Sequence, residues 1–452
     1  MTTRTGEDPA DTPARTRAVS PVQAGLLYEH ALGGDARYVD QAIHTINGPL
    51  DHGAFREAMR RLIDACDALR MRFPAGPGGV RRLAFGPVPE AFPILDARGR
   101  ARAARIADRL ARRETRRPFD LARSGTRAVL VRIADERHVL IWTYHHAIAD
   151  SWAIRLLQRR LCRIYASLVE GRSDEDEARV PYECYLDWID RQDEERSLAF
   201  WRDYLGAPTE PAVPLDVDLR APQRVIRARL GAEALARVHA LRKALRTTAN
   251  AVVLSAWGLY ILHRAQRTRC VLGCVVSGRA IRLREVHEIV GTLSNTVPVL
   301  IDARLSVRDL VGGIGRHLLG ADPHAHLSLG AIMAAGGRRY EDLASVVNFT
   351  IDETRLSDPH LARHALDVPS IRYDDRANFG AYLDIAVGDD AVVLDIAYTP
   401  PAWRFSQGEI EAACGRLLDA MAHAPDAPAV RAVDALLWRA DEALRADLAF
   451  DR

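Results

Sequence analysis

Two adjacent histidines give this chain its clearest candidate for chemistry. The string YHHAIADSW, residues 144–152, places His145 and His146 four to five residues before Asp150. A neutral imidazole, with an ordinary pKa of about 6.5, accepts a proton at cellular pH. Such a group suits general-base work on an amine or a hydroxyl. The string therefore predicts proton transfer from a nucleophile.

The elements on either side of this string determine what each histidine faces. Residues 137–144, RHVLIWTY, are nearly all apolar and predict a strand buried on both faces, and residues 151–169 have the apolar spacing of a helix. Successive side chains at a strand end point to opposite faces, so only one histidine enters a given cleft. Asp150 is expected to cap the helix or to pair with a buried arginine. The residues alone leave open the alternative that both histidines only satisfy backbone groups.

The rest of the chain alternates helices and strands, which predicts two α/β sandwich halves. Residues 1–18 are expected to be a disordered tail, and the acidic stretch at 170–181 places the boundary between halves at 19–178 and 179–452. Helices are predicted over 54–69, 101–116, 182–204, 232–245, 249–264 and 409–422. Strands are predicted over 128–133, 270–277, 296–302, 343–349, 382–387 and 392–398.

Composition excludes several classes of function. The 62 basic and 60 acidic residues leave a net charge of +2, which gives no electrostatic reason to bind nucleic acid or an anionic membrane. The six cysteines have no metal-binding spacing, and Cys270 and Cys274 are interpreted as strand residues facing a core. The uncharged run 247–263 is shorter than the ~18 apolar residues of a membrane span. We expect a cytoplasmic protein with no metal and no signal peptide.

Five ordered segments resemble motifs of the condensation domains of nonribosomal peptide synthetases, within the chloramphenicol acetyltransferase-like superfamily. They are SPVQAGLLYEHAL, LRMRF, RRPFDLARSGTRAVLVRIADERHVLIWTYHHAIADSW, PYECYLDWIDRQDEERSLAFWRDYL, and VLGCVVSGRA followed by VGTLSNTVPVLI. The resemblance runs from Ser20 through most of the chain. It implies an α+β sandwich fold of two acetyltransferase-like subdomains in a V-shaped arrangement with a tunnel between them.

The resemblance also assigns roles to individual residues. His146 would be the catalytic histidine and His145 a structural one. Asp150 would form an ion pair with Arg279 of the SGR turn and so hold the histidine loop in shape. Backbone N–H groups at the start of the following helix would stabilise the oxyanion.

Other residues are implied to line the substrate channel, namely Ser151, Trp152 and Asn295. Ser151 stands where the family usually has glycine, so its side chain would narrow the channel or add a hydroxyl. The alternative is that Ser151 only caps the helix that begins there. A second departure is Cys66 and Asp67, where histidine and glutamate are usual in the family.

The function implied is that of a free-standing condensation enzyme, since the chain ends within about 30 residues of the last predicted helix. It would transfer an acyl, peptidyl or polyketide chain from the phosphopantetheine thioester of a carrier protein, supplied in trans, to an amine or hydroxyl. The acceptor would be a small molecule or a second carrier-bound group. We expect a monomer that binds no cofactor of its own. Two alternatives are a coenzyme A-dependent acyltransferase and a non-catalytic domain that recruits carriers.

Five arginines recur every three or four residues, so they share one face of the helix predicted over 101–116. They are Arg102, Arg105, Arg109, Arg112 and Arg116. This face could dock an acidic carrier or coenzyme phosphates. We favour an ordinary solvated face, because the chain uses arginine for nearly every cation.

Overall fold

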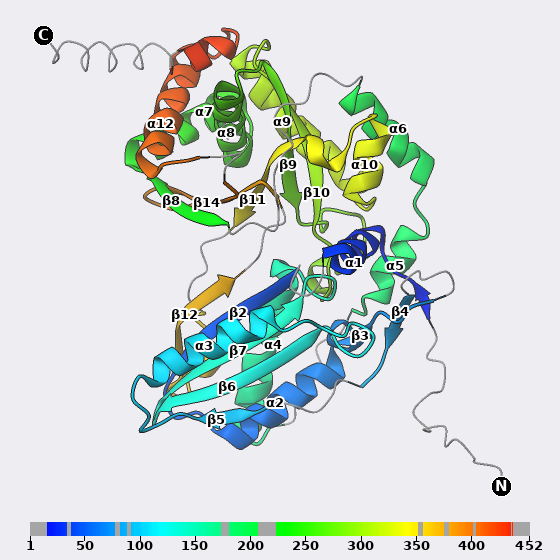
Figure 1. The fold of residues 1–452 in the computed structure, drawn as a ribbon, viewed down its shortest axis with the longest axis vertical. Coiled ribbons are helices and arrows are strands. Elements are labelled where there is room, and N and C mark those ends of the chain that lie inside the picture. The colour runs from blue at the N-terminus through cyan, green and yellow to red at the C-terminus, as the bar shows by residue number, and fades with distance from the viewer. Residues whose placement is uncertain are drawn as a thin grey trace, which may run out of the picture. The chain divides into compact units, whose positions relative to one another are not determined.

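The computed structural model describes residues 16–33, 38–76, 82–87, 92–172, 180–206, 223–350, 356–374, 379–400, 404–434 and 436. Its contacts divide the chain into two compact units, drawn in Figure 1. The first unit comprises Met1–Gln192, Arg282–Leu293 and Glu353–Arg376, and the second comprises Asp193–Ile281, Ser294–Asp352 and Ala377–Arg452. The predicted halves, 19–178 and 179–452, differ from this division in two ways: the first unit continues 14 residues further, to Gln192, and two later segments return to it.

The first unit is built on a five-stranded sheet with the order β12-β2-β7-β6-β5. Its strands are β12 (Asp367–Asp374), β2 (Val39–Asn47), β7 (Arg137–His145), β6 (Thr126–Ala134) and β5 (Ile94–Asp96). All neighbours are antiparallel except β5 and β6. The central strand β7 is buried along nearly its whole length, as the apolar run at 137–144 predicts.

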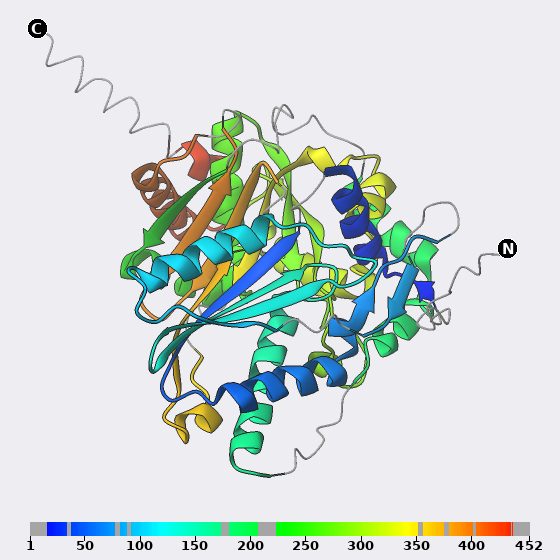
Figure 2. The same ribbon diagram turned by 60° about the horizontal axis from the view of Figure 1, so that its bottom comes forward.

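Helices cover both faces of this sheet (Figure 2). On one face, α3 (Ala103–Arg116) packs against the odd-numbered residues Val139 and Ile141 of β7. On the other face lie α2 (His52–Ala65) and α4 (Ser151–Val169). The unit also holds α1 (Pro21–Gly33), α5 (Glu183–Ile189), α11 (Pro359–Ala362), the turns η1 (Asp67–Arg70) and η3 (Val286–Glu288), and a small sheet of β1 (Arg17–Ala18), β4 (Arg82–Phe85) and β3 (Met71–Arg72).

The second unit has a six-stranded sheet with the order β10-β9-β11-β13-β14-β8. These strands are β10 (Asn295–Asp302), β9 (Arg269–Val276), β11 (Leu343–Thr350), β13 (Ala381–Val387), β14 (Val392–Tyr398) and β8 (Arg224–Leu230). Its core is shared with α7 (Ala232–Leu245), α8 (Ala249–Ala265), α9 (Val307–Ala321) and α12 (Gln407–His423). Cys270 and Cys274 lie in this core, as expected.

A row of polar side chains crosses four strands of the second sheet. Arg227 on β8 donates two hydrogen bonds to Asp395 on β14, at 2.7 and 2.6 Å. Asp395 pairs across the strands with Asp384 on β13, and Asn348 on β11 donates to Asp384 at 2.8 Å. Burial raises the pKa of Asp384 to about 6, against the lowering effect of the Asn348 bond. The ionised form of this carboxyl is therefore disfavoured in the folded protein.

Two sequence expectations need correction, and four elements named below had no expectation. The helix predicted over 182–204 is two helices, α5 and α6 (Glu194–Leu205), because Asp193 caps a new helix by accepting a hydrogen bond from the backbone N–H of Arg196. Arg17 and Ala18, placed in the disordered tail, form β1, and Arg17 pairs with Asp187 and Asp190. The rest of that tail, residues 1–15, lies outside the described residues. The strands β2, β8 and β12 and the helix α9 were not predicted.

Within the described ranges, no helix has both the length and the apolar character needed to cross a membrane. The six cysteines are free thiols, five of them buried.

Candidate active site

The histidine pair lies where the central strand of the first unit ends. β7 ends at His145, and α4 begins at Ser151. His145 pairs with Val39 of β2, and the N–H of His146 donates to the carbonyl of Tyr38 at 2.8 Å, which extends the ladder by one residue. By strand alternation His145 continues the row of Ile141, and His146 continues the row of Trp142 on the α4 side.

His145 is buried and holds the turn. It has no exposed surface, its Nδ1 accepts the N–H of Ala147 at 3.1 Å, and its carbonyl accepts the N–H of Ile148 at 2.9 Å. Burial, followed by the nearby rings of His30 and His146, holds the pKa of His145 well below its usual value. The ring is therefore neutral, with its proton on Nε2, and it is placed to support the loop.

His146 faces solvent and a carboxylate. Its side chain is 29% exposed, and its Nδ1 lies 2.5 Å from Oδ2 of Asp40, whose side chain is 6% exposed. Asp40 lies opposite Tyr144 in the β2–β7 pairing, so His146 is its diagonal neighbour on the same face, within side-chain reach. Sequence reasoning missed Asp40. The polar residues that follow Asp40 in the sequence, such as Gln41 and His44, give no signal that it lies on a buried strand.

Asp150 joins the histidine loop to two other segments. Its Oδ1 accepts the N–H of Ala153 at 2.8 Å and so caps α4, which is one of the two alternatives the sequence left open. Its Oδ2 accepts the N–H of Leu293 at 3.0 Å. Asp150 is 1% exposed. Both of its oxygens therefore hold backbone groups in the interior of the first unit.

The segment at 291–293 packs closely under the same loop. The Thr292 hydroxyl donates to the carbonyl of His146, and the Tyr182 hydroxyl donates to the carbonyl of Thr292 at 3.0 Å. Gly291 has φ +151°, and a Cβ at this position would collide with the ring of Tyr182. Glycine is therefore required at this close approach.

The start of α1 provides a further support. Ser20 and Gln23 bond reciprocally, side chain to backbone, at 3.1 and 3.0 Å in the manner of a capping box. The Gln23 amide also donates to the carbonyl of Ala147 at 2.9 Å. The opening motif thus fixes the middle of the histidine loop.

The predicted channel residues in the first unit are Ser151 and Trp152. Ser151 is exposed at the first position of α4, and the cap is Asp150, so the interpretation of Ser151 as the cap is wrong. The Trp152 indole N–H donates to the carbonyl of His287 at 2.9 Å, and the two rings lie 5.6 Å apart. Trp152 therefore ties η3 to α4, and the channel roles of both residues stay predictions.

The remaining predicted residues belong to the second unit. The Asn295 amide donates to the carbonyls of Ala325 and Leu327, both at 2.7 Å, so in this structure it holds a loop. Arg279 is 2% exposed and donates from Nη1 to the carbonyl of Ser277 at 3.0 Å. The Asp150–Arg279 ion pair and the channel role of Asn295 stay predictions.

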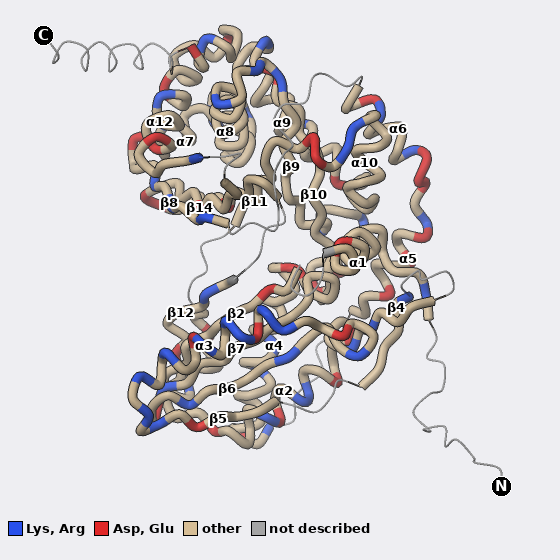
Figure 3. Tube along the Cα trace, viewed as in Figure 1, with Lys and Arg blue, Asp and Glu red and all other residues tan. Residues whose placement is uncertain are grey.

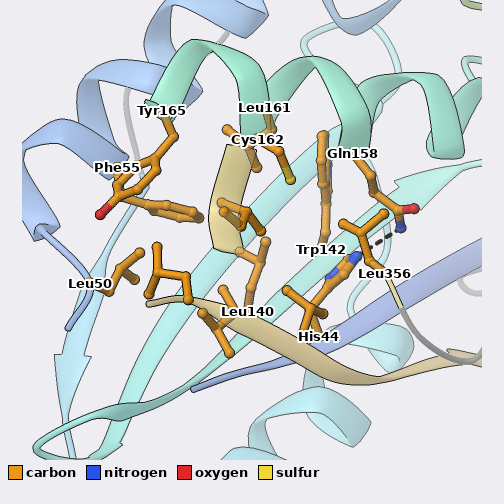
Figure 4. A pocket seen from close by; sticks show the side chains of 14 residues that line it. His44, Leu50, Phe55, Leu140, Trp142, Gln158, Leu161, Cys162, Tyr165 and Leu356 are labelled. Atoms are coloured by element: carbon orange, nitrogen blue, oxygen red, sulfur yellow. Dashed lines mark hydrogen bonds between the residues drawn. The ribbon is translucent and has the colours of Figure 1, made fainter. Parts of the chain in front are cut away.

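A small apolar cavity lies on the same sheet face as the His146–Asp40 pair, between β2, β7 and α4 (Figure 4). Its volume is about 40 Å³, room for a few water-sized molecules but not for a long acyl chain. The Gln158 amide and His44 Nε2 lie 2.7 Å apart at one side, and burial lowers the pKa of His44 to about 4. The lining includes Phe55, Leu140, Trp142, Leu161, Cys162, Tyr165 and Leu356.

Two other features of the sequence, Asp67 and the arginine stripe, have structural surroundings that give them no part in the histidine loop. Asp67 accepts the N–H of Tyr182 at 2.7 Å, and burial raises its pKa. The arginines of the stripe on and beside α3 are exposed, as expected of a solvated face. Figure 3 colours the basic residues along the chain trace blue. In the described part of the chain, no three or more His, Cys, Asp or Glu side chains group as metal ligands would.

Comparisons with known proteins agree with the fold. The family model described as "Condensation domain" matches residues 14–443. The chain is 24% identical to bacitracin synthase 3 of Bacillus licheniformis, over 84% of its own length and 6% of that protein. It is also 24% identical to surfactin synthase subunit 3 of Bacillus subtilis (strain 168), over 84% of this chain and 31% of that protein. The chain thus spans less than a third of these relatives.

Solved structures with the same fold cover nearly the whole chain. The starter condensation domain of rhizomide synthetase RzmA aligns with a TM-score of 0.74 at 19% identity, over 92% of this chain and 98% of that one. The first condensation domain of the calcium-dependent antibiotic synthetase, in complex with a substrate analogue, aligns with a TM-score of 0.72 at 17% identity over the same shares. The α+β fold predicted from the sequence is confirmed.

Proposed function

The chain belongs to the condensation-domain family, and from that premise we propose that it is an acyltransferase of nonribosomal peptide synthesis. The donor is an acyl, peptidyl or polyketide thioester on the phosphopantetheine arm of a carrier protein. The acceptor is an amine or a hydroxyl, free or carrier-bound. The protein itself needs no bound cofactor, because the thioester already carries the activated acyl group.

The arrangement of the histidine pair carries this proposal. Of two histidines at one strand end, His145 is buried and neutral, whereas His146 exposes its ring beside a buried carboxylate. A ring held in this way, at the end of a rigid strand, has the placement that general-base catalysis requires.

In the proposed reaction, the acceptor nitrogen or oxygen attacks the thioester carbonyl while His146 takes its proton. Because Nδ1 faces Asp40, Nε2 is the ring atom that would accept this proton. A C–N or C–O bond forms, the C–S bond breaks, and the imidazolium returns the proton to the departing thiolate. The N–H groups of Ser151 and Trp152, in the first turn of α4, would stabilise the oxyanion. Orienting two substrates supplies much of the rate, and proton transfer adds ~10²–10⁴-fold.

The central experiment compares two histidine–carboxylate pairs in the first unit. His146→Ala should lower kcat by ~10²–10⁴-fold. It also leaves the buried Asp40 carboxylate without its ring partner, so we expect a folded protein with a lower melting temperature. The matched control is His364→Ala, which removes a histidine whose Nε2 lies 3.1 Å from Glu170 on another part of the unit. That control should keep full turnover. Near-normal turnover in His146→Ala would refute the general-base role.

The donor is tested by offering one acyl group on a carrier protein and on coenzyme A, with products identified by mass spectrometry. The coenzyme A arm is included because a starter condensation domain of this fold was solved with C8-CoA and Leu-SNAC. We expect a higher kcat/KM with the carrier. Preference for coenzyme A would favour the coenzyme-dependent acyltransferase. Carrier binding without turnover of any donor would favour a non-catalytic recruiting domain.

A further inference from the structure

We propose that Asp40 is a positioning residue that fixes the tautomer and orientation of the His146 ring. This inference rests on the proposed function, because it concerns how His146 is prepared to accept a proton. It assigns a role to a residue that lies 106 positions earlier in the chain, on a different strand.

The contact is short, buried on one side and held by the sheet. Asp40 Oδ2 and His146 Nδ1 are 2.5 Å apart, which is shorter than the ~2.7–2.9 Å of an ordinary charge-assisted N–H···O⁻ hydrogen bond. Asp40 has only 6% of its side chain exposed, so little water competes for its oxygens. Its backbone is set by the β2–β7 register, and the adjoining bond from the His146 N–H to the Tyr38 carbonyl fixes the backbone of the histidine.

Chemistry then decides where the imidazole proton lies. An ionised carboxylate accepts hydrogen bonds but cannot donate one, so the bond requires a proton on Nδ1. In a neutral ring the lone pair is then on Nε2, which is the form a general base needs on that atom. When Nε2 takes a second proton, the carboxylate stabilises the imidazolium that forms. This is the role of the carboxylate in a serine-protease triad.

The neighbouring histidine has the opposite arrangement. His145 uses Nδ1 as an acceptor for the Ala147 N–H and keeps its proton on Nε2. Two adjacent histidines are thus set in different tautomers by different partners. The difference gives Asp40 a specific effect, because removing it should change the proton position in His146 and leave His145 unchanged.

The structural alternative is that the bond only satisfies a buried carboxylate. Asp40→Asn separates the two, because asparagine keeps the size of the side chain and loses the anionic acceptor. Asp40→Glu keeps a carboxylate on a longer arm. Gln41→Leu is the matched control on the same strand, because it removes the bonds from the Gln41 amide to Thr143 (2.8 Å) and Ala111 (3.2 Å) on the other face of the sheet.

The first measurement needs no substrate. With selectively ¹⁵N-labelled histidine, the ring nitrogens of His146 are assigned by their absence in His146→Ala. We expect a protonated Nδ1 in the wild type and in Gln41→Leu, and loss of this signature in Asp40→Asn. Because the amide oxygen of asparagine can still accept from Nδ1–H, Asp40→Ala is measured as well, and an unchanged His146 signature in Asp40→Ala would overturn the proposal, whatever the activity of the enzyme.

The second measurement is steady-state transfer. Asp40→Asn should lower kcat by about 10²-fold and keep KM within about twofold. The loss of kcat cannot exceed the ~10²–10⁴-fold that the general base itself contributes, because Asp40 acts only through His146. Asp40→Glu should recover part of that loss, whereas Gln41→Leu should lower the melting temperature and leave kcat unchanged. Equal kcat in Asp40→Asn and wild type would also overturn the proposal. Full turnover in His146→Ala would instead refute the general-base role of His146, and the tautomer measurement would still decide what Asp40 does. Failure of the proposed function is a different outcome, namely no turnover of any donor by the wild type.

Discussion

Removing the Asp150 carboxylate should destabilise the first unit more than any other single change in the histidine loop. The reason is that each oxygen holds a different backbone group: Oδ1 accepts from Ala153 at the start of α4, and Oδ2 accepts from Leu293. Asp150→Ala removes both acceptors at once in an interior site, because both Asp150 and Leu293 are 1% exposed.

The magnitude follows from the two bonds. Loss of a helix cap costs about 1 kcal/mol. Loss of a charge-assisted bond, with the Leu293 N–H left buried and unpaired, costs about 2–3 kcal/mol more. The free energy of unfolding should therefore fall by about 3–4 kcal/mol. At about 2–4 °C per kcal/mol for a unit of this size, the melting temperature should fall by about 10 °C.

Asp150→Ser provides the internal comparison, since serine is also a good cap but is too short to hold Leu293 as well. It should keep the bond to Ala153 and lose about 2–3 kcal/mol. Urea and thermal unfolding, followed by tryptophan fluorescence, measure both variants. A loss below about 1 kcal/mol in Asp150→Ala would refute this reasoning.

The same variant tests the ion pair that the family resemblance implies with Arg279. In a double-mutant cycle with Arg279→Ala, losses that are clearly less than additive would support a direct pairing. Fully additive losses would show that the two side chains do not interact.

Two further outcomes are expected. Ser151→Gly should raise kcat/KM for bulky acceptors and change the free energy of unfolding by only a few tenths of a kcal/mol, because Asp150 provides the cap; unchanged acceptor selectivity would contradict the channel role. Asp384→Asn should stabilise the protein at pH 7 but not at pH 4. The folded-state pKa of Asp384 is about 6, above its usual 3.8, so its contribution to stability is greatest below pH 4 and falls as the pH rises towards 6. The gain at pH 7 should be about 1–2 kcal/mol after allowance for partial solvation, and equal melting temperatures at pH 7 would contradict it.

Local patterns predicted most of what lies next to the histidines. The apolar run before His145 and the helical spacing after Asp150 predicted the bounds of β7 and α4 to within one residue. These predictions succeeded because the buried positions of both elements carry apolar side chains, so burial is visible in the local sequence pattern. Strand alternation also separated the two histidines onto opposite faces.

The features that local patterns did not predict depend on the pairing of segments far apart in the sequence. β2 carries the polar residues Asp40, Gln41 and His44 at buried positions, so its sequence lacks the apolar pattern by which a buried strand is predicted. Their burial makes sense only with β7 and β12 on either side of the strand. The contact between Asp40 and His146 depends on that register, as does the bond from Asp150 to Leu293, 143 residues later.

The pairing of β12 with β2 bears on how the protein is made at the ribosome. Ser370 meets Thr45 across 325 residues of sequence, so β2 has an open edge until β12 has been synthesised. At about 5–20 residues per second, that delay is roughly 16–65 s. During this interval the strand that carries Asp40 has an unpaired edge open to other chains. An excised segment ending near residue 192 would have the same open edge permanently, so expression of the first half alone should give an aggregation-prone product.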